Sequence, residues 1–507
     1  MDAPMDELAG RDPIGEGLIF QYAYYASLTL SGAAFYLYLT HIFPTSSVGS
    51  VALLLAIVSL FPAFFSLGLQ YGWQHFISYF IGQGKSGEVH GIIRQAIRTG
   101  LVLSAAAVIF LLASAHYISV LFFHTAAYTT LVFLLALDIP SAIMISILNG
   151  MMLGLQRFKT AGIIGMTYVV IVYGSSVVLL KASQSLNAVP IGWGIGYFIG
   201  VLMYYYELTK WPVKAQQKGI GLREVLKYST PLYATGILSV GASYIDRLTV
   251  AFFKNLSSIG VYTLVLLIVS GVGLLSAPIG GVIFSKFSEF YAKKDNQMIR
   301  EGVRISVNAA SVLYIPAALG VSALAVPLLR VLGGPAYVIG SVPLAIILTV
   351  NALVIVGGPM GSALQGTRKT LIFVLSTSIA LISNLVLSVL LIPSLSLTGA
   401  AIGYSSVGTV SFVVIFAYAW KSGVVKLDIR MLSRIWLSAI VMSALVYLFA
   451  TVTGFSGILI PFYVIAGLVT YLLMLKATSA LSETDKELLK RLIPGELGLL
   501  KAFVELL

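Results

Sequence analysis

The stretch from Leu222 to Asn255 reads LREVLKYSTPLYATGILSVGASYIDRLTVAFFKN, and it carries an Asp246-Arg247 pair about two thirds of the way along an apolar helix. This helix is long enough to cross a bilayer. A charge at the centre of a membrane costs roughly 3 kcal/mol to insert, so such charges usually serve a function. Two interpretations stand. Either the pair is neutralised or sits near the interface, or it faces a polar cavity.

The composition is that of a polytopic membrane protein. Of the 507 residues, 58% are hydrophobic and 10% are charged, whereas about a quarter of residues are charged in soluble domains. The sequence contains no cysteine, which excludes disulfides, thiol nucleophiles and cysteine-based metal sites. The net charge of +12 would suggest a nucleic-acid partner for a soluble protein. Here the charge is better explained by the membrane, and we expect no nucleic acid.

Apolar windows of about 20 residues, the length that crosses a hydrocarbon core of roughly 30 Å, recur along the whole chain. The sequence therefore predicts an all-α polytopic membrane protein with about 14 transmembrane helices. The longest window is expected to continue as helix beyond the membrane. The predicted spans are 18–43, 48–82, 94–115, 128–154, 161–181, 188–207, 225–253, 258–285, 303–329, 338–365, 370–392, 397–420, 433–453 and 456–475.

The distribution of Lys and Arg predicts the orientation of these spans. Of the 31 basic residues, 27 fall on one side of the alternating spans, and Lys181, Lys254 and Arg330 fall on the other. Because cytoplasmic segments are the basic ones, the sequence predicts a multi-pass protein of the cytoplasmic membrane with both termini in the cytoplasm. The N-terminus is acidic, unlike a cleavable signal peptide, so we expect the first span to be retained.

Three short motifs recur in the same order along the chain. Ser46-Ser47-Val48-Gly49 returns as Ser257-Ser258-Ile259-Gly260, Leu155-Gln156 as Leu364-Gln365, and the segment 192–197 as 399–404, at offsets of 211, 209 and 207 residues. The recurrence predicts two pseudo-symmetric six-helix lobes in the same orientation, with a shared site between them near the midplane. Two C-terminal helices lie outside the repeat.

The repeat and the charge pattern together predict the domain organisation. In the tail, Ser482-Glu483-Thr484-Asp485 resembles a capping box that starts a surface helix. The predicted parts are a cytoplasmic N-terminal tail (1–17), an N-lobe of six spans (18–208), a cytoplasmic linker (209–224), a C-lobe of six spans (225–420), two further spans (421–476) and a cytoplasmic amphipathic tail (477–507).

The sequence offers little support for an enzyme. It contains no HExxH motif, no P-loop, no G-x-S-x-G and no G-x-G-x-x-G, so zinc hydrolase, nucleotide hydrolase and serine hydrolase chemistry are unsupported. The external segments are nearly free of carboxylates, which a membrane glycosyltransferase would need. We therefore expect neither catalysis nor a metal or cofactor.

Polar residues inside the spans are the candidates for a substrate-binding cavity. Gln70 and Gln74 lie four residues apart, hence on one helix face, with His75 beside them. For amides such as these and Asn351, the alternative is an interhelical hydrogen bond that stabilises the bundle. Asp138 precedes Pro140, so its carboxylate either satisfies backbone groups near the proline or is a titratable cavity group that couples an ion. The full candidate set is Arg247, Asp246, Asp138, Gln70, Gln74, His75 and Asn351.

Several segments resemble the polysaccharide flippases of the multidrug/oligosaccharidyl-lipid/polysaccharide exporter superfamily. They are LGLQYGWQHFISYFIGQGKSGE (67–88), LQRFK (155–159), YIDRL (244–248), IGVYTLVLLIV (259–269) and LIPSLSLTGAAIGY (391–404), and the resemblance covers about residues 15–420. It implies a V-shaped pair of lobes around a cationic or polar cavity. Among the intramembrane basic residues of that family, the match in this chain is Arg247.

The resemblance also implies the activity and the partners. It implies the transfer of a lipid-linked oligosaccharide from the cytoplasmic to the external leaflet by alternating access. The partners would be membrane lipid, the lipid-linked glycan and a coupling ion, H⁺ or Na⁺, and we expect a monomer. The alternative is a multidrug or small-cation antiporter of the same architecture. Such an antiporter should have an acid-lined cavity, whereas a diphosphate headgroup prefers Arg or Lys.

Overall fold

The chain is divided into two compact units. A computed structural model describes residues 14–210, 220–275, 287, 290, 295–366 and 371–479. Unit 1 comprises Met1–Tyr244 with Asn255–Gly260, and unit 2 comprises Ile245–Lys254 with Val261–Leu507. The predicted tails at 1–17 and 477–507, and the middle of the predicted linker 209–224, lie wholly or largely outside the described residues.

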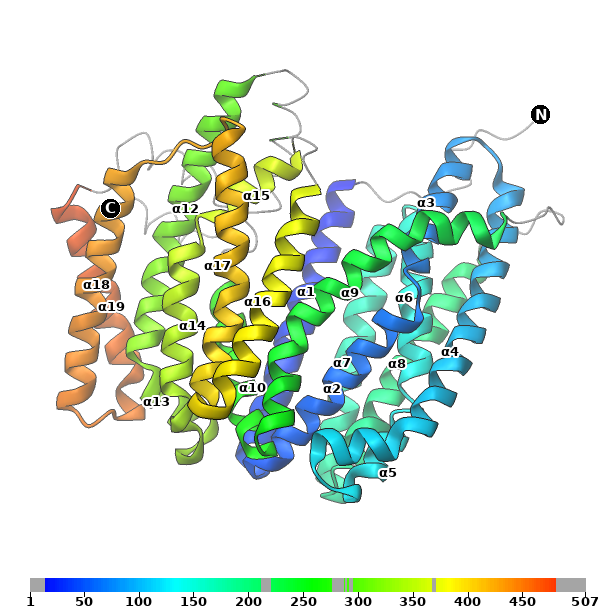
Figure 1. The fold of residues 1–507 in the computed structure, drawn as a ribbon, viewed down its shortest axis with the longest axis horizontal. Coiled ribbons are helices and arrows are strands. Elements are labelled where there is room, and N and C mark those ends of the chain that lie inside the picture. The colour runs from blue at the N-terminus through cyan, green and yellow to red at the C-terminus, as the bar shows by residue number, and fades with distance from the viewer. Residues whose placement is uncertain are drawn as a thin grey trace. The chain divides into compact units, whose positions relative to one another are not determined.

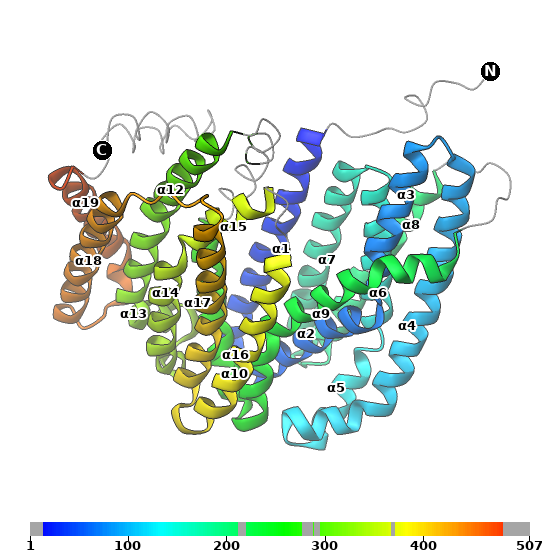
Figure 2. The same ribbon diagram turned by 45° about the horizontal axis from the view of Figure 1, so that its top comes forward.

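Unit 1 is built around α7, which lies between α1 and α8, while α6 packs against α3, α4 and α8 (Figure 1, Figure 2). Its elements are α1 (Ile14–Ile42), α2 (Thr45–Phe65), α3 (Leu69–Gly82), α4 (Ser86–Phe123), η1 (Ala126–Tyr128), α5 (Thr129–Leu134), α6 (Ile139–Gly154), α7 (Phe158–Ser183), α8 (Ala188–Thr209) and the larger part of α9 (Leu222–Phe253).

Unit 2 is built around α17, which lies between α14 and α16, while α12 packs against α14 and α18 (Figure 1). Besides the end of α9 and most of α10 (Leu256–Gly273), it contains α12 (Asn296–Ala323), α13 (Ala325–Gly333), η2 (Pro335–Gly340), α14 (Ser341–Val354), α15 (Gly357–Gly366), α16 (Leu371–Leu395), α17 (Leu397–Lys421), α18 (Ile429–Val452), η3 (Gly457–Leu459) and α19 (Ile460–Ala477).

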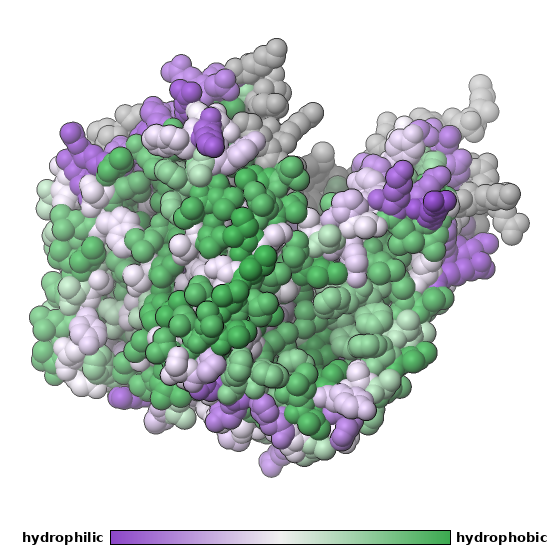
Figure 3. All heavy atoms as spheres, viewed as in Figure 1, coloured by the Kyte–Doolittle hydropathy of each residue, from purple (hydrophilic) through white to green (hydrophobic). Residues whose placement is uncertain are grey.

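The predicted all-α membrane fold is confirmed. In the described part of the chain, 13 helices are long and apolar enough to cross a membrane by length and composition. The helix α1, with 29 residues, lies at the first predicted span but is not among these 13. Hydrophobic side chains cover the lengths of the helices in both units, and hydrophilic side chains gather at helix ends (Figure 3). This is the surface that a bilayer requires.

Several predicted spans consist of two helices rather than one. The predicted span 48–82 is broken between α2 and α3, where Leu67 and Gly68 have φ values of 50° and 66°. A Cβ on Gly68 would lie 2.8 Å from the Tyr233 Cβ, so glycine is needed for space as well as for conformation. The predicted span 128–154 is broken before Pro140, which sits in the first turn of α6, where its missing N–H costs nothing.

Glycines bring the helices of each unit into backbone contact. In unit 1 a Cβ on Gly196 of α8 would lie 2.5 Å from the Val172 Cα of α7, and in unit 2 a Cβ on Gly399 of α17 would lie 2.5 Å from the Leu391 carbonyl carbon of α16. Both glycines belong to the recurring segment 192–197 and 399–404. Small residues at these two positions therefore let neighbouring helices approach closely in each unit.

The recurring Ser-Ser-x-Gly motifs make the same contact in both directions. A Cβ on Gly49 of α2 would collide with the Leu256 carbonyl oxygen, and a Cβ on Gly260 of α10 would collide with the Thr45 carbonyl oxygen. Both glycines lie in unit 1. The two recurring motifs therefore contact each other through their glycines within unit 1.

Candidate functional site

The charged pair of α9 lies at the start of unit 2, against α10. The Asp246 side chain is fully buried, and its Oδ2 accepts a hydrogen bond of 2.7 Å from the hydroxyl of Tyr262. The same hydroxyl lies 3.3 Å from the carbonyl oxygen of Ala400 on α17. A buried carboxylate is tolerated only where a donor or a cation compensates it, and Tyr262 supplies the donor.

Arg247 follows Asp246 directly on α9 and is half-buried. Its charge interacts with Asp246 and with the hydroxyl of Tyr404 on α17. A guanidinium stays protonated in proteins, so it must reach water, an acid or an anionic ligand. The two charges therefore form one polar centre with Tyr262 and Tyr404, which we call the α9 charge centre.

The sequence did not identify the two tyrosines of the α9 charge centre. Tyr262 stands in an otherwise apolar run and Tyr404 follows a glycine, so neither shows a pattern by itself. The signal that could have found Tyr262 is the need of Asp246 for a donor. The short connection between α9 and α10 makes the next helix the first place to look.

A second polar position in unit 2 lies between α16 and α17. Asn384 is fully buried, and its Oδ1 accepts a 2.9 Å hydrogen bond from the Ser388 hydroxyl. The Gly403 backbone faces both side chains, and a Cβ there would collide with Ser388. Asn351 of α14 is half-buried and interacts with the hydroxyl of Tyr314 on α12. The Asn384 bond lies within α16, whereas Asn351 and Tyr314 come from two helices, as expected for an amide that joins helices.

Asp138 occupies the break between α5 and α6 in unit 1. It is fully buried, and neither carboxylate oxygen has a hydrogen-bond partner among the described residues. Its side chain makes no capping bond to α6, so the interpretation in which it satisfies backbone groups near Pro140 is not supported. A Cβ on Gly194 of α8 would lie 3.1 Å from the Asp138 Oδ1, so the carboxylate points toward α8.

The interior of unit 1 contains tyrosine hydroxyls that the sequence did not identify. Tyr24 and Tyr168 share a hydrogen bond of 2.8 Å, and Tyr204 donates to the Asn149 Oδ1 at 3.1 Å. Tyr197 interacts electrostatically with Asp138. Tyr197 and Tyr204 are seven residues apart on α8, a spacing that places both on one face and that could have identified this cluster.

The three candidates on α3 lie in unit 1, in contact with two other helices. The backbone oxygens of Gln70 and Gln74 would lie 2.5 Å and 2.8 Å from a Cβ on Gly150 and Gly154 of α6, so α3 and α6 are in backbone contact. The ring of His75 stacks on Tyr228 of α9, with centroids 4.0 Å apart. His75 is exposed, whereas the Gln70 Oε1 is buried without a hydrogen-bond partner among the described residues.

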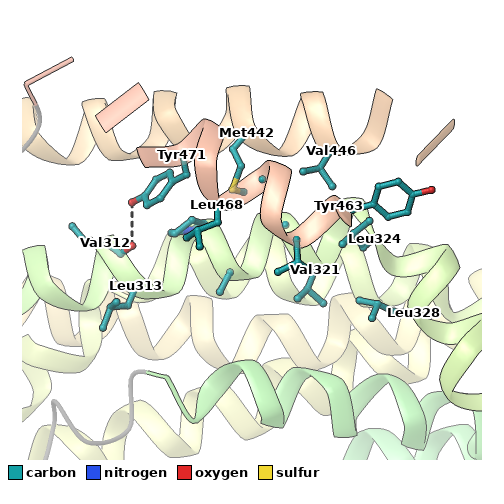
Figure 4. Close-up of a pocket in the computed structure, with 15 residues that line it drawn as sticks. Val312, Leu313, Val321, Leu324, Leu328, Met442, Val446, Tyr463, Leu468 and Tyr471 are labelled. Atoms are coloured by element: carbon teal, nitrogen blue, oxygen red, sulfur yellow. Dashed lines mark hydrogen bonds between the residues drawn. The ribbon is translucent and has the colours of Figure 1, made fainter. Parts of the chain in front are cut away.

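Unit 2 also holds an apolar cavity of about 390 Å³, between α12, α18 and α19. The side chains that point into it come from all three helices (Figure 4). Both lining tyrosines have their hydroxyls engaged elsewhere, since Tyr471 donates to the Val312 carbonyl oxygen at 3.0 Å and Tyr463 bonds to Thr453. The cavity thus offers almost nothing but hydrocarbon to an occupant.

The sequence comparisons match this chain to proteins of polysaccharide and glycan biosynthesis. Residues 39–343 match the family model described as polysaccharide biosynthesis protein. The "Probable low-salt glycan biosynthesis flippase Agl15" of Haloferax volcanii is 23% identical over 273 residues, which cover 54% of this chain and 58% of that relative. The chain thus matches less than two thirds of the length of this relative.

Solved structures share the fold at low sequence identity. The lipid II flippase MurJ, in an inward closed conformation, superposes with a TM-score of 0.70 at 16% identity, over 91% of this chain and 98% of that one. An inward-facing multidrug resistance MATE family transporter superposes with a TM-score of 0.62 at 16% identity, over 78% and 94%. A MOP superfamily transporter from Pyrococcus furiosus gives 0.55 at 18%, over 83% and 98%. These structures show a shared fold, and the family model confirms the predicted resemblance to polysaccharide biosynthesis proteins.

Proposed function

The chain belongs to the polysaccharide biosynthesis protein family, and from this premise we propose that it is a flippase that moves a lipid-linked oligosaccharide or polysaccharide precursor across the cytoplasmic membrane. The proposal commits to a substrate with three parts: a hydrocarbon chain, an anionic link and a glycan. Agl15 is named as a glycan biosynthesis flippase, and MurJ as a lipid II flippase. The hydrocarbon chain requires an apolar surface on the protein, and the anionic link requires a cation.

The observation that carries the proposal is the apolar cavity between α12, α18 and α19. Its volume of about 390 Å³ is within the range of ligand sites. Its tyrosine hydroxyls bond to protein groups, so an aqueous or polar occupant would find few partners there. A hydrocarbon chain fits such a cavity, and α18 and α19 are the two helices that lie outside the predicted twelve-helix repeat.

The α9 charge centre supplies a cation for the anionic link. A guanidinium forms paired hydrogen bonds to phosphate oxygens, and Arg247 is half-buried within the apolar part of α9. In this role Arg247 binds the phosphate of the carrier lipid. The bond from Tyr262 to Asp246 keeps the carboxylate from requiring Arg247 as its sole compensation.

We infer that the protein is a transporter and not an enzyme, and that it works by alternating access. A lipid-linked glycan that crosses a membrane needs no bond broken, so catalytic residues are not required. Asp138 is the group best placed to bind a coupling proton or Na⁺, because it is buried and neither oxygen has a partner among the described residues. The monomeric state and the cytoplasmic position of both termini belong to the same proposal.

A multidrug or small-cation antiporter is the second candidate, and the same carboxylate favours it. Asp138 and Asp246 are both fully buried, and acids inside spans are the groups that cation antiporters use. Against it, the described lining of the large cavity in unit 2 contains no carboxylate. The flippase therefore accounts for more of the molecule.

Complementation of a strain that lacks its own glycan flippase tests the proposal. We expect the chain to restore surface glycan, and Ala317→Phe, which fills the apolar cavity, to lose most of that activity at unchanged expression. The control is Ala444→Phe on the exposed side of α18, which should complement normally. If neither the parent chain nor the control restores surface glycan, and the cells that carry them export a cationic dye, the protein is assigned as an antiporter instead.

A further inference from the structure

A second cavity, of about 360 Å³, lies in unit 1 between the first turns of α4 and the last turn of α8, and it is basic. His90, Arg94 and Arg98 of α4 line it, each four residues after the last, and Tyr205 and Thr209 of α8 line it opposite, also four residues apart. Spacing by four places residues on one helix face. The cavity therefore lies between a cationic face of α4 and a hydroxyl-bearing face of α8, and Ile93, Ile97 and Leu208 complete its lining.

The described surroundings leave these cations available to a ligand. The lining of the cavity contains no carboxylate. Glu207, the one acid in α8, is engaged by Lys210 at 2.6 Å and Arg157 at 3.6 Å. The His90 Nδ1 is buried and has no hydrogen-bond partner among the described residues. Two arginines and an unpaired histidine nitrogen therefore line a cavity that contains no described carboxylate.

An apolar track continues from the basic cavity along both helices. On α4, Leu101 and Val102 follow Arg98 by about one turn and are 56% and 68% exposed. On α8, Leu202 and Phe198 precede Tyr205 by about one and two turns and are 49% and 57% exposed. Hydrophobic side chains cover the middle of this face of unit 1, and hydrophilic ones gather above and below them (Figure 3).

The length of α4 places the basic cavity at the level of lipid headgroups. The helix has 38 residues, which at a rise of about 1.5 Å each gives about 57 Å, against a hydrocarbon core of about 30 Å. The apolar track occupies the part that crosses the core, so Arg94 and Arg98 lie at its boundary. A headgroup at the cations would therefore have its chains beside the track.

We propose that this cavity binds the phosphate headgroup of an anionic membrane lipid, with the acyl chains along Leu101, Val102, Leu202 and Phe198. The cavity shares no lining residue with the α9 charge centre or with the apolar cavity of unit 2. The lipid is therefore a constituent of the surrounding membrane and not the transported substrate. Two arginines supply the charge for a phosphate. The exposed apolar track distinguishes a lipid from a soluble phosphate ion.

Native mass spectrometry of the full-length chain, purified in a neutral detergent and mixed with phosphatidylglycerol and phosphatidylcholine, tests this proposal. We expect one phosphatidylglycerol to be retained with a preference of about thirtyfold, as two cations near a headgroup would give. The preference should vanish in the double variant Arg94→Gln with Arg98→Gln. It should persist in the control Arg223→Gln with Arg430→Gln, which removes two exposed arginines outside the cavity.

The outcomes separate the lipid from its alternatives. An equal loss of preference in the control would show a general effect of charge and overturn the site, as would an unchanged preference in the cavity variant. Displacement of the lipid by excess inorganic phosphate would assign a soluble anion and overturn the lipid. If the cavity variant fails to fold, Arg94→Lys with Arg98→Lys replaces it. We expect that variant to retain part of the preference, because charge survives without the paired hydrogen bonds, and an undiminished preference would contradict the site.

Discussion

Arg247 is the residue whose removal should affect transport more than stability. Asp246 keeps its 2.7 Å bond from Tyr262 when the guanidinium is removed, so the carboxylate is not left without a donor. We predict that Arg247→Ala abolishes glycan transport in cells with expression near normal, and that Arg247→Lys retains part, because charge survives without the paired donors. Arg330→Ala, on the predicted external side, serves as the control and should transport normally.

The structural alternative for Arg247 makes a different prediction. If the main role of Arg247 is to compensate Asp246, its removal leaves a poorly compensated buried charge at a cost of roughly 3 to 5 kcal/mol, and the protein should disappear from the membrane fraction. A stable Arg247→Ala variant with full transport would contradict both roles. It would move the site to Asp138 and the Gln70–Gln74 face of α3.

Asp138 is the residue on which ion coupling should depend. Asn has nearly the shape of the acid but cannot exchange a proton. We predict that Asp138→Asn folds as well as the parent chain, with an equal or higher midpoint of thermal unfolding, because no described hydrogen bond to the carboxylate is lost. Transport should lose its response to an imposed proton or Na⁺ gradient. A variant that still responds to both gradients would exclude Asp138 as the coupling group.

At the scale of helices, the reciprocal contact of Gly49 and Gly260 predicts two matched variants. A methyl group on either glycine would collide with a backbone carbonyl, and backbone cannot move aside as a side chain can. We expect Gly49→Ala and Gly260→Ala each to lower the free energy of unfolding by about 1 to 3 kcal/mol, measured as a lower midpoint of thermal unfolding in detergent. Gly271→Ala on α10, with no atom within 4 Å of its Cβ, should be neutral. If only one of the two variants is destabilised, the contact is not reciprocal.

The element scale also shows what the sequence could and could not predict. Apolar length identified the helices, because the membrane allows few other structures. The break at Gly68 was not predicted, because it depends on Tyr233 of α9, more than 160 residues away. The charge centre was half predicted: Asp246 and Arg247 stand out as charges in an apolar run, whereas Tyr262 and Tyr404 acquire meaning only when α10 and α17 are placed beside α9.

At the scale of the whole molecule, the two units repeat one order of packing. In unit 1, α4 packs on α6, α6 on α8 and α7 on α8. In unit 2, α12 packs on α14, α14 on α17 and α16 on α17. The order matches the recurring motifs at an offset of about 210 residues. Superposition of residues 18–207 on 225–420 by a rotation about the membrane normal therefore remains our prediction for the two lobes.

The orientation in the membrane can be tested directly, because the chain has no cysteine of its own. The basic residues predict that single cysteines at Ser47, Lys254 and Ser456 react with an impermeant reagent from outside the cell. Cysteines at Gln83, Gln216 and Ser482 should react only after the membrane is opened. The opposite accessibility at any one of these sites would break the fourteen-span arrangement.

The central claim is that this chain moves a lipid-linked glycan from one leaflet to the other, and one measurement tests it most directly. The purified chain is placed in vesicles that carry a lipid-linked oligosaccharide with a fluorescent glycan, and an external reagent quenches the outer leaflet. The account predicts that the quenched fraction rises from about half towards the whole with the parent chain and with Ala444→Phe. With Arg247→Ala or Ala317→Phe it should stay near the level of empty vesicles. A quenched fraction that stays at the empty-vesicle level with the folded parent chain would contradict the claim.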